Sequence, residues 1–202
     1  WQGWVSDVVQ GSHWLRRRGQ TPHTDPDQVP PLWLWGLRAG CLVAAEAARQ
    51  LGEPCNFLFW QPPASGKPLL QQFLRLKVVG DMLGGEGKGI MAGMRQQLGA
   101  GAPVEVAGYR LAPDMASGLE QATLQPPSPG GPPQRLEWLE LSTRDDASLS
   151  LVSAQTIDAW QHAGYTARSH IVTGPAFWQT TEIEDAPALI ATTTAALHGL
   201  PA

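Results

Sequence analysis

One short segment combines the residue spacing and the flanking elements that catalysis could use. Residues 36–40, Gly-Leu-Arg-Ala-Gly, lie between the apolar residues 32–35 and an Ala-rich segment that ends at Gly52. A buried strand, a turn with a glycine two positions on either side of one residue, and a helix together form the sharp turn that presents a catalytic nucleophile. The glycines fit this turn because its central residue is forced into strained backbone space and its neighbours must be small.

The centre of this turn is Arg38, where a nucleophile would be Ser, Cys or Asp. A guanidinium stays protonated and does not attack a carbonyl. At a helix N-terminus it can instead hold a carboxylate or a phosphate through paired hydrogen bonds. The competing interpretation is a salt bridge to a nearby carboxylate, Asp145 or Asp146. Trp178, in a Gly-Pro loop, could line a pocket or close over an apolar ligand.

The residues that could act as nucleophile, base or acid do not form a recognisable set. Cys41, just beyond the turn, is either a thiol activated by a helix N-terminus or a small apolar residue packed under the first helical turn. His170 falls within an expected strand, whereas the base of a triad would follow the last strand, so a core or edge histidine competes with a general base. Asp146 follows the strand expected at 135–141, where a triad acid would lie, and is otherwise a solvated carboxylate. The candidates for catalysis are Ser65, Cys41, Asp146 and His170.

Composition and charge narrow the class of protein. The chain has 202 residues, 43% hydrophobic and 16% charged, which describes one globular domain with a sizeable core. Its net charge of -4 argues against nucleic-acid binding, and no apolar run approaches the ~18 residues that a membrane span needs. Two cysteines are too few for a disulfide framework, which favours a reducing cytoplasm. The histidines show no metal-ligand spacing, so we expect neither a metal nor a cofactor.

Helical and strand patterns alternate along the chain. Their order is α-β-α-β, then a helical insertion, then β-α-β-α, which predicts a mostly parallel sheet. Ser153 is the expected N-cap of one helix, and Pro187 lies near the start of the last. Strands are expected at 32–35, 56–60, 104–107, 135–141 and 167–172, and helices at 4–18, 41–51, 68–83, 90–98, within 109–124, 153–163 and 182–197.

Three separated segments are together similar to one family. They are residues 32–49 with the Gly-Leu-Arg-Ala-Gly turn, residues 60–67 with Trp-Gln-Pro and Ser-Gly-Lys, and residues 174–183 with Gly-Pro-Ala-Phe-Trp-Gln-Thr and Glu-Ile. This set resembles the second of two exosortase A system-associated hydrolase families. These families belong to the α/β-hydrolase superfamily and accompany bacterial exosortase and exopolysaccharide genes. The resemblance spans nearly the whole chain.

The resemblance implies an α/β-hydrolase-like fold, with a mostly parallel sheet, helices on both faces and a helical cap. Residues 1–61 would form the first part of the core, residues 62–133 the cap insertion, and residues 134–202 the C-terminal part of the core. Family members carry a further N-terminal portion with the first strands of the sheet, so a chain that opens on Trp1 is expected to be processed or a fragment. A sheet without those strands would expose an unpaired edge, which predicts a homo-oligomer formed through that edge.

The family name implies hydrolysis of an ester or a thioester, with an acyl or glycolipid-like molecule bound under the cap. The triad is degenerate, because Arg38 occupies the nucleophile position and Phe177-Trp178 lies near the histidine position. Since a fold alone does not license a function, a second hypothesis is a non-catalytic α/β-hydrolase-like protein in which Arg38 holds an anionic ligand or partner. The residues assigned to binding are Arg38, Leu37, Gln61 and Trp178.

Overall fold

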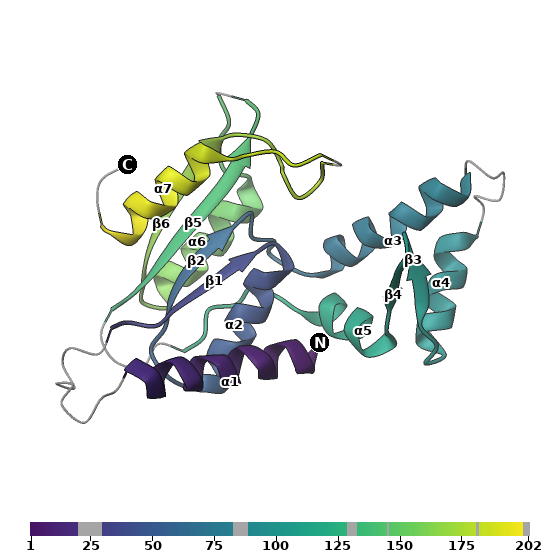
Figure 1. Ribbon diagram of the computed structural model, residues 1–202, viewed down its shortest axis with the longest axis horizontal. Coiled ribbons are helices and arrows are strands. Elements are labelled where there is room, and N and C mark those ends of the chain that lie inside the picture. The colour runs from purple at the N-terminus through teal and green to yellow at the C-terminus, as the bar shows by residue number, and fades with distance from the viewer. Residues whose placement is uncertain (20–29, 83–88, 129–132, 145, 181, 200–202) are drawn as a thin grey trace. The chain divides into compact units, whose positions relative to one another are not determined.

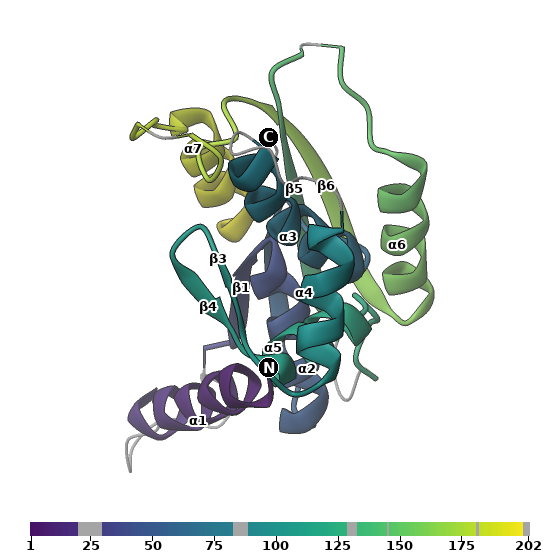
Figure 2. The same cartoon turned by 90° about the vertical axis from the view of Figure 1, so that its right-hand side faces the viewer.

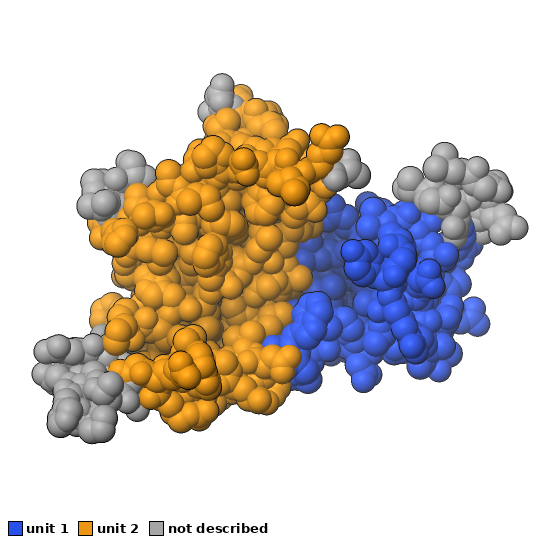
Figure 3. Space-filling view, in the orientation of Figure 1, with its two compact units in different colours: residues 1–4, 65–123 blue, residues 5–64, 124–202 orange. Residues whose placement is uncertain are grey.

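The computed structural model (Figure 1) describes residues 1–19, 30–82, 89–128, 133–144, 146–180 and 182–199. The chain forms two compact units (Figure 3). The larger, called the sheet unit, comprises residues 5–64 and 124–202. The smaller, called the small unit, comprises residues 1–4 and 65–123.

The sheet unit contains the strands β1 (Trp33–Leu37), β2 (Asn56–Trp60), β5 (Gln134–Ser142) and β6 (Tyr165–Thr173). All neighbouring strands are parallel, in the order β1-β2-β5-β6, so β1 lies at one edge of the sheet. This arrangement confirms the expected α/β class and its parallel sheet. The accompanying helices are α1 (Gln2–Gly19), α2 (Ala39–Leu51), α6 (Leu151–His162) and α7 (Pro187–Leu197).

Helices cover both faces of this sheet. On one face Trp160 of α6 packs edge-on against Phe57 and Phe59 of β2, with ring centroids 4.9 and 5.6 Å apart. On the other face Trp60 Nε1, from the same strand, donates a hydrogen bond to Thr193 Oγ1 of α7 (2.9 Å). Successive residues of a strand point to opposite faces, so α6 and α7 lie on opposite sides of the sheet (Figure 2). The right-handed crossover between parallel strands places α2 on the side of α6.

Three helix ends show how local chemistry sets the boundaries. α2 ends at Gly52, which adopts a left-handed conformation and donates its N–H to Ala48 O (3.1 Å), as expected. The N-cap of α6 is Ser150 and not the expected Ser153, because the Ser150 hydroxyl accepts the Ser153 N–H (3.0 Å). α7 begins only at Pro187, later than the apolar pattern indicates, since proline fits a first helical turn whose N–H groups lack partners within the helix.

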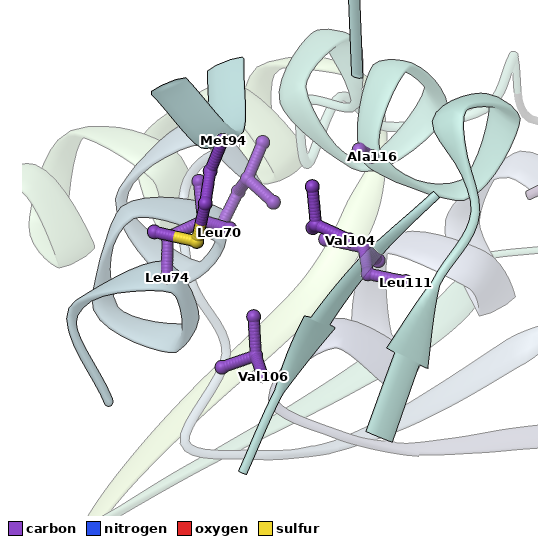
Figure 4. Close-up of a cluster of buried hydrophobic side chains, with 7 residues drawn as sticks. All are labelled: Leu70, Leu74, Met94, Val104, Val106, Leu111 and Ala116. Carbon is purple, nitrogen blue, oxygen red and sulfur yellow. The ribbon is translucent and has the colours of Figure 1, made fainter. Parts of the chain in front are cut away.

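The small unit has a core of its own. It contains the helices α3 (Lys67–Met82), α4 (Ile90–Gly99) and α5 (Pro113–Gln121) and the antiparallel strands β3 (Val104–Val106) and β4 (Tyr109–Leu111). Apolar side chains from all five elements meet in one buried cluster (Figure 4). Its buried members are Leu70, Leu74, Met94, Val104, Val106, Leu111 and Ala116.

The second strand of the small unit is the element that the sequence pattern misses. β4 falls in a segment for which only a helix is predicted, and it is three residues long. Its hairpin turn uses Ala107 and Gly108, both at positive φ (50° and 80°), as a two-residue turn between antiparallel strands requires. The usual residues at such a turn are Asn-Gly or Asp-Gly, so an alanine in the first position hides it.

Candidate functional site

Arg38 lies at the sharp turn between β1 and α2, at the carboxyl edge of the sheet. Its backbone has φ 51° and ψ -117°, a conformation that a residue with a side chain rarely adopts. The Arg38 N–H donates to Trp60 O (2.9 Å), and Arg38 O accepts the Cys41 N–H (3.0 Å), so hydrogen bonds on both sides fix the turn. Holding a non-glycine residue there costs about 1–3 kcal/mol, which marks the turn as a candidate for function.

The two glycines of the turn have different roles. A Cβ at Gly36 would lie 2.5 Å from Cys41 N and 2.7 Å from Gly40 C, both of which are backbone atoms. A Cβ at Gly40 would meet no atom within 4 Å. The expectation that both glycines are required is therefore wrong for Gly40. Only position 36 requires glycine, because α2 approaches the end of β1 too closely for a Cβ atom.

Gln61 follows β2 as Arg38 follows β1, and the carboxyl ends of parallel strands meet at one edge of a sheet. The backbone of Gln61 also has a positive φ, 46°. Its N–H donates to Leu139 O (2.8 Å) and its Oε1 accepts the Leu141 N–H (2.9 Å), which joins the end of β2 to β5. Because the amide oxygen is used in this way, Nε2 is the group of Gln61 that can serve a ligand as a donor.

Trp178 lies beside Arg38. Arg38 Cζ is 5.6 Å from the centre of the indole ring, a cation–π contact. Trp178 packs edge-on against Phe177 (5.1 Å between ring centroids), which in turn contacts Trp60 (6.2 Å). Trp178 Nε1 is buried and has no hydrogen-bond partner among the described residues. Buried indole N–H groups usually find a partner, and a buried donor without one costs about 1–3 kcal/mol, so this N–H is an open donor next to a cation.

The Arg38 guanidinium is partly withdrawn from water. Burial lowers its pKa, an effect that the neighbouring Cys41 opposes. A guanidinium nevertheless keeps its charge at neutral pH. A guanidinium in this position can pair with a carboxylate or a phosphate.

Leu37 contributes packing and not a polar contact. It lies against a buried apolar cluster on the α7 face of the sheet, where it fixes the end of β1 next to Arg38. Of the four residues assigned to binding, Arg38, Gln61 and Trp178 therefore present donors at this edge, and Leu37 supports the backbone beside them. The buried members of the cluster are Leu58, Trp60, Leu139, Val172 and Leu189.

Cys41 is fully buried under the turn. Its Sγ donates a weak hydrogen bond to Gly36 O (3.2 Å). Burial raises the pKa of the thiol well above its ordinary value, although backbone hydrogen bonds and the charge of Arg38 oppose the rise. A nucleophilic cysteine needs a thiolate and access to the substrate. These surroundings are those of a small apolar residue packed under α2.

His170 belongs to a hydrogen-bonded network around the buried carboxylate of Glu137. Its Nε2 lies 2.9 Å from Glu137 Oε2, and Arg135 Nη2 lies 2.7 Å from Glu137 Oε1. Burial raises the pKa of Glu137, but hydrogen bonds from His170 and Arg135 and their charges lower it more, so the net pKa is lowered. Arg135 also donates to Ala196 O at the end of α7, so the network fastens that helix to the sheet. Three strand spacings of ~4.8 Å separate β6 from β1, which keeps His170 away from Arg38.

Asp146 and Ser65, the two other candidates for catalysis, lie in different parts of the chain. Asp146 is 88% exposed and pairs with Arg144 at 3.6 Å, a surface contact that contributes little. Asp145, the other expected acid, lies outside the described residues. Ser65 belongs to the small unit, where it forms an isolated antiparallel bridge with Thr123. Within the described part of the chain, neither Asp146 nor Ser65 has the histidine partner that a triad requires.

Sequence reasoning missed two features of the sheet unit. The first is Glu137, a fully buried carboxylate, which the residue types of its strand do not single out because Arg135 and Glu140 belong to the same strand. The second is the open N–H of Trp178, for which the sequence carries no signal, because burial and the lack of a partner follow from the folded loop.

The described residues were also searched for metal sites and for membrane-spanning helices, and the chain was compared with known proteins. The described residues contain no group of three or more His, Cys, Asp or Glu that could hold a metal ion. Among the same residues, no helix combines the length and the apolar character needed to cross a membrane. No protein-family model matches the chain, and no curated protein matches it either. The function is therefore inferred from the geometry of the sheet edge.

Proposed function

We propose that the chain is a non-catalytic α/β-hydrolase-like protein that binds an acyl or glycolipid-like molecule through an anionic group at the Arg38 turn. The observation that carries the proposal is the strained Arg38 beside the buried Trp178 N–H, which lacks a partner among the described residues. The Arg38 guanidinium, Gln61 Nε2 and Trp178 Nε1 are all donors. A ligand bound beside Trp178 Nε1 would supply an acceptor to it, and the positive charge of Arg38 favours a carboxylate or a phosphate.

The hydrolase-like part of the proposal is supported by the turn itself. A strand, a strained central residue, a glycine forced two positions before it and a helix are the features of a nucleophile elbow. Trp178, in the loop after the last strand, contacts the central residue, as the histidine of a triad would contact its nucleophile. With Arg38 and Trp178 in these two positions, an elbow of this kind would lack the groups that perform acyl transfer.

The alternative is hydrolysis of an ester or a thioester, the activity that the family resemblance implies. The elbow-like turn is the observation that favours it. It needs a nucleophile other than Arg38, for which Ser65 and Cys41 are the candidates. Burial of Cys41 and the raised pKa of its thiol argue against the second of them.

The binding proposal is tested by titrating the purified chain with octanoate and with inorganic phosphate, one probe for each class of anion. Calorimetry gives the Kd, and ¹H–¹⁵N correlation spectra follow the indole N–H signals. Trp178→Phe, which keeps the ring packing and removes the N–H, identifies the signal that binding should shift. We expect Arg38→Ala to weaken binding about tenfold or more. Arg144→Ala, which removes an exposed arginine, should leave the Kd unchanged.

Two outcomes contradict this proposal. One is a ligand-induced shift of the Trp178 indole signal that survives Arg38→Ala, and the other is the absence of any such shift with either probe. Short- and medium-chain p-nitrophenyl esters test the alternative in parallel. Turnover that Ser65→Ala or Cys41→Ala abolishes would establish an enzyme with a displaced nucleophile.

Three wider expectations belong to the same proposal. Association with the bacterial exosortase and exopolysaccharide system depends on the motif resemblance alone. A cytoplasmic location is supported by Cys41 and Cys55, which are buried free thiols. A homo-oligomer through β1 is supported by the position of this strand at the sheet edge and by the exposed Trp35 on it. Light scattering across a concentration series measures the oligomeric state.

A further inference from the structure

A pocket of about 550 Å³ lies at the opposite end of the strands from Arg38. Asn56 and Gln134, the first residues of β2 and β5, line it together with basic side chains of α1. We propose that this pocket binds a small organic molecule that carries an oxyanion group, a phosphate or a carboxylate. The proposal concerns a site that is separate from the Arg38 turn and does not depend on it.

The charges that line the pocket favour an anion. Three basic side chains, His13, Arg16 and Arg17, come from one turn of α1, at positions i, i+3 and i+4 on one side of the helix. Among the described residues that line the pocket they face one carboxylate, Glu53, which lies 3.3 Å from Arg16 Nε. Because Arg16 offsets Glu53, the guanidinium of Arg17 gives the described lining residues a net positive charge.

The positions of the polar side chains also favour an acceptor as ligand. Arg16 Nε is buried and lies 3.3 Å from Glu53 Oε2, so this nitrogen is taken up by the ion pair. Its Nη2 donates to Pro54 O (3.2 Å), which holds the side chain in place. The Oδ1 of Asn56 accepts the Arg135 N–H (2.8 Å), and Nδ2 is the donor that Asn56 can offer a ligand. An oxyanion satisfies such donors and a cation does not.

The size and the walls of the pocket indicate that the anion has a carbon skeleton. Its volume falls within the roughly 300–1,000 Å³ of small-molecule sites and far exceeds the ~30 Å³ that one water occupies. Pro31, Pro54 and Pro133 supply rigid apolar surface beside the charged groups. A bare inorganic ion would leave this surface without contacts, whereas a sugar or a short carbon chain would cover it.

The two candidate sites are far enough apart to be tested separately. β1 has five residues, which span ~16 Å at ~3.3 Å each, and the pocket lies before its first residue while Arg38 follows its last. Arg38→Ala should therefore leave binding at this pocket unchanged. Binding of ribose 5-phosphate and citrate that Arg38→Ala abolishes and Arg17→Gln leaves unchanged would assign these ligands to the turn and overturn the present inference.

The test is calorimetric titration of the purified chain with ribose 5-phosphate, citrate and inorganic phosphate. Arg17→Gln removes a lining charge, and Arg18→Gln is the matched control, because Arg18 is the next residue of the helix and lies over the Trp14 ring (4.6 Å). We expect Arg17→Gln to weaken binding about tenfold and Arg18→Gln to change it less than about twofold. Glu53→Gln should tighten binding severalfold, since it removes the carboxylate that an anion would face.

Several results would overturn the proposal. Equal losses in Arg17→Gln and Arg18→Gln would show unspecific attraction to the basic end of α1. Inorganic phosphate that binds as tightly as ribose 5-phosphate and citrate would remove the argument for an organic ligand. No saturable binding of any of the three probes would exclude the site. Thermal unfolding of each variant confirms that the compared proteins are folded.

Discussion

The close approach of α2 to β1 makes Gly36 the position where one added methyl group should do the most damage. That methyl would lie 2.5, 2.6 and 2.7 Å from Cys41 N, Cys41 Cα and Gly40 C, well inside van der Waals contact. Since all three are backbone atoms, relief requires α2 to move away from the strand and strains the bond from Arg38 N–H to Trp60 O. Overpacking costs about 1–3 kcal/mol and a lost hydrogen bond about 1 kcal/mol. We therefore expect Gly36→Ala to lower the free energy of unfolding by about 3 kcal/mol.

Gly40→Ala is the matched substitution two residues beyond Arg38. Its methyl group meets no atom within 4 Å, and it lies in the first turn of α2, where alanine is favoured over glycine by up to about 1 kcal/mol. We expect its free energy of unfolding to equal that of the parent chain or to exceed it by that amount. At about 2–4 °C per kcal/mol for a chain of this size, the two variants should differ in Tm by about 10 °C.

Urea unfolding followed by circular dichroism measures both free energies, and the m-value shows whether the unfolded or folded ensemble has changed. If the two units unfold in separate transitions, only the transition of the sheet unit should move. Equal stability of the two variants, or a larger loss for Gly40→Ala, would refute the packing of α2 on β1. The elbow-like geometry of Arg38 would then lose its structural basis.

Three further substitutions test the groups around the sheet edge. Arg38→Gly should raise the free energy of unfolding by about 1–3 kcal/mol in urea unfolding, because it relieves the positive φ, whereas Arg38→Ala should not. Trp178→Phe should raise it by about 1 kcal/mol, by removing a buried donor without a described partner, while calorimetry shows weaker anion binding. Glu137→Gln should lower it by about 3 kcal/mol, because Arg135 and His170 lose their buried carboxylate. Since the folded pKa of Glu137 is lowered, its stabilisation is complete above the unfolded pKa of ~4.3 and disappears as the pH falls through the folded pKa. Acid titration of stability should therefore be flatter for Glu137→Gln than for the parent chain.

The sheet strands are readable from the sequence because each is a short apolar run between turn residues. β2 has the bounds expected, since Phe-Leu-Phe is buried on both faces and has no helical period to compete with it. β4 is not predicted, because two of its three residues are exposed and its turn begins with Ala107, which is not a usual turn residue. The cap of α6 is misjudged because Ser150 and Ser153 are both suitable caps, and only the folded backbone decides which hydroxyl accepts the bond.

The sequence predicts those parts of the candidate site whose residues are close together along the chain. Arg38 is found from the glycine spacing, although the sequence could not show that Gly36 is forced and Gly40 is not. The contact between Arg38 and Trp178 joins two distant parts of the chain through a loop, so spacing alone could not predict it. The Glu137–His170 pair depends on strand register, which sets Glu137 opposite Arg168 and so brings His170, two residues on, to the same face.

Two features that lower the stability of the fold lie next to each other, and a ligand titration can test whether they serve binding. The strain at Arg38 and the open N–H of Trp178 each cost about 1–3 kcal/mol, against a total stability of about 5–15 kcal/mol for an ordinary domain. Glycine at 38 would remove the first cost and phenylalanine at 178 the second. If the site serves an anion, the ligand stabilises the parent chain by about 2.7 kcal/mol at 100 times its Kd and leaves Arg38→Gly unchanged. Without ligand, Arg38→Gly should then have a higher free energy of unfolding than the parent chain. At saturating ligand this difference should disappear. If the difference in stability between Arg38→Gly and the parent chain stays the same in octanoate and in phosphate, the strain at Arg38 does not serve anion binding.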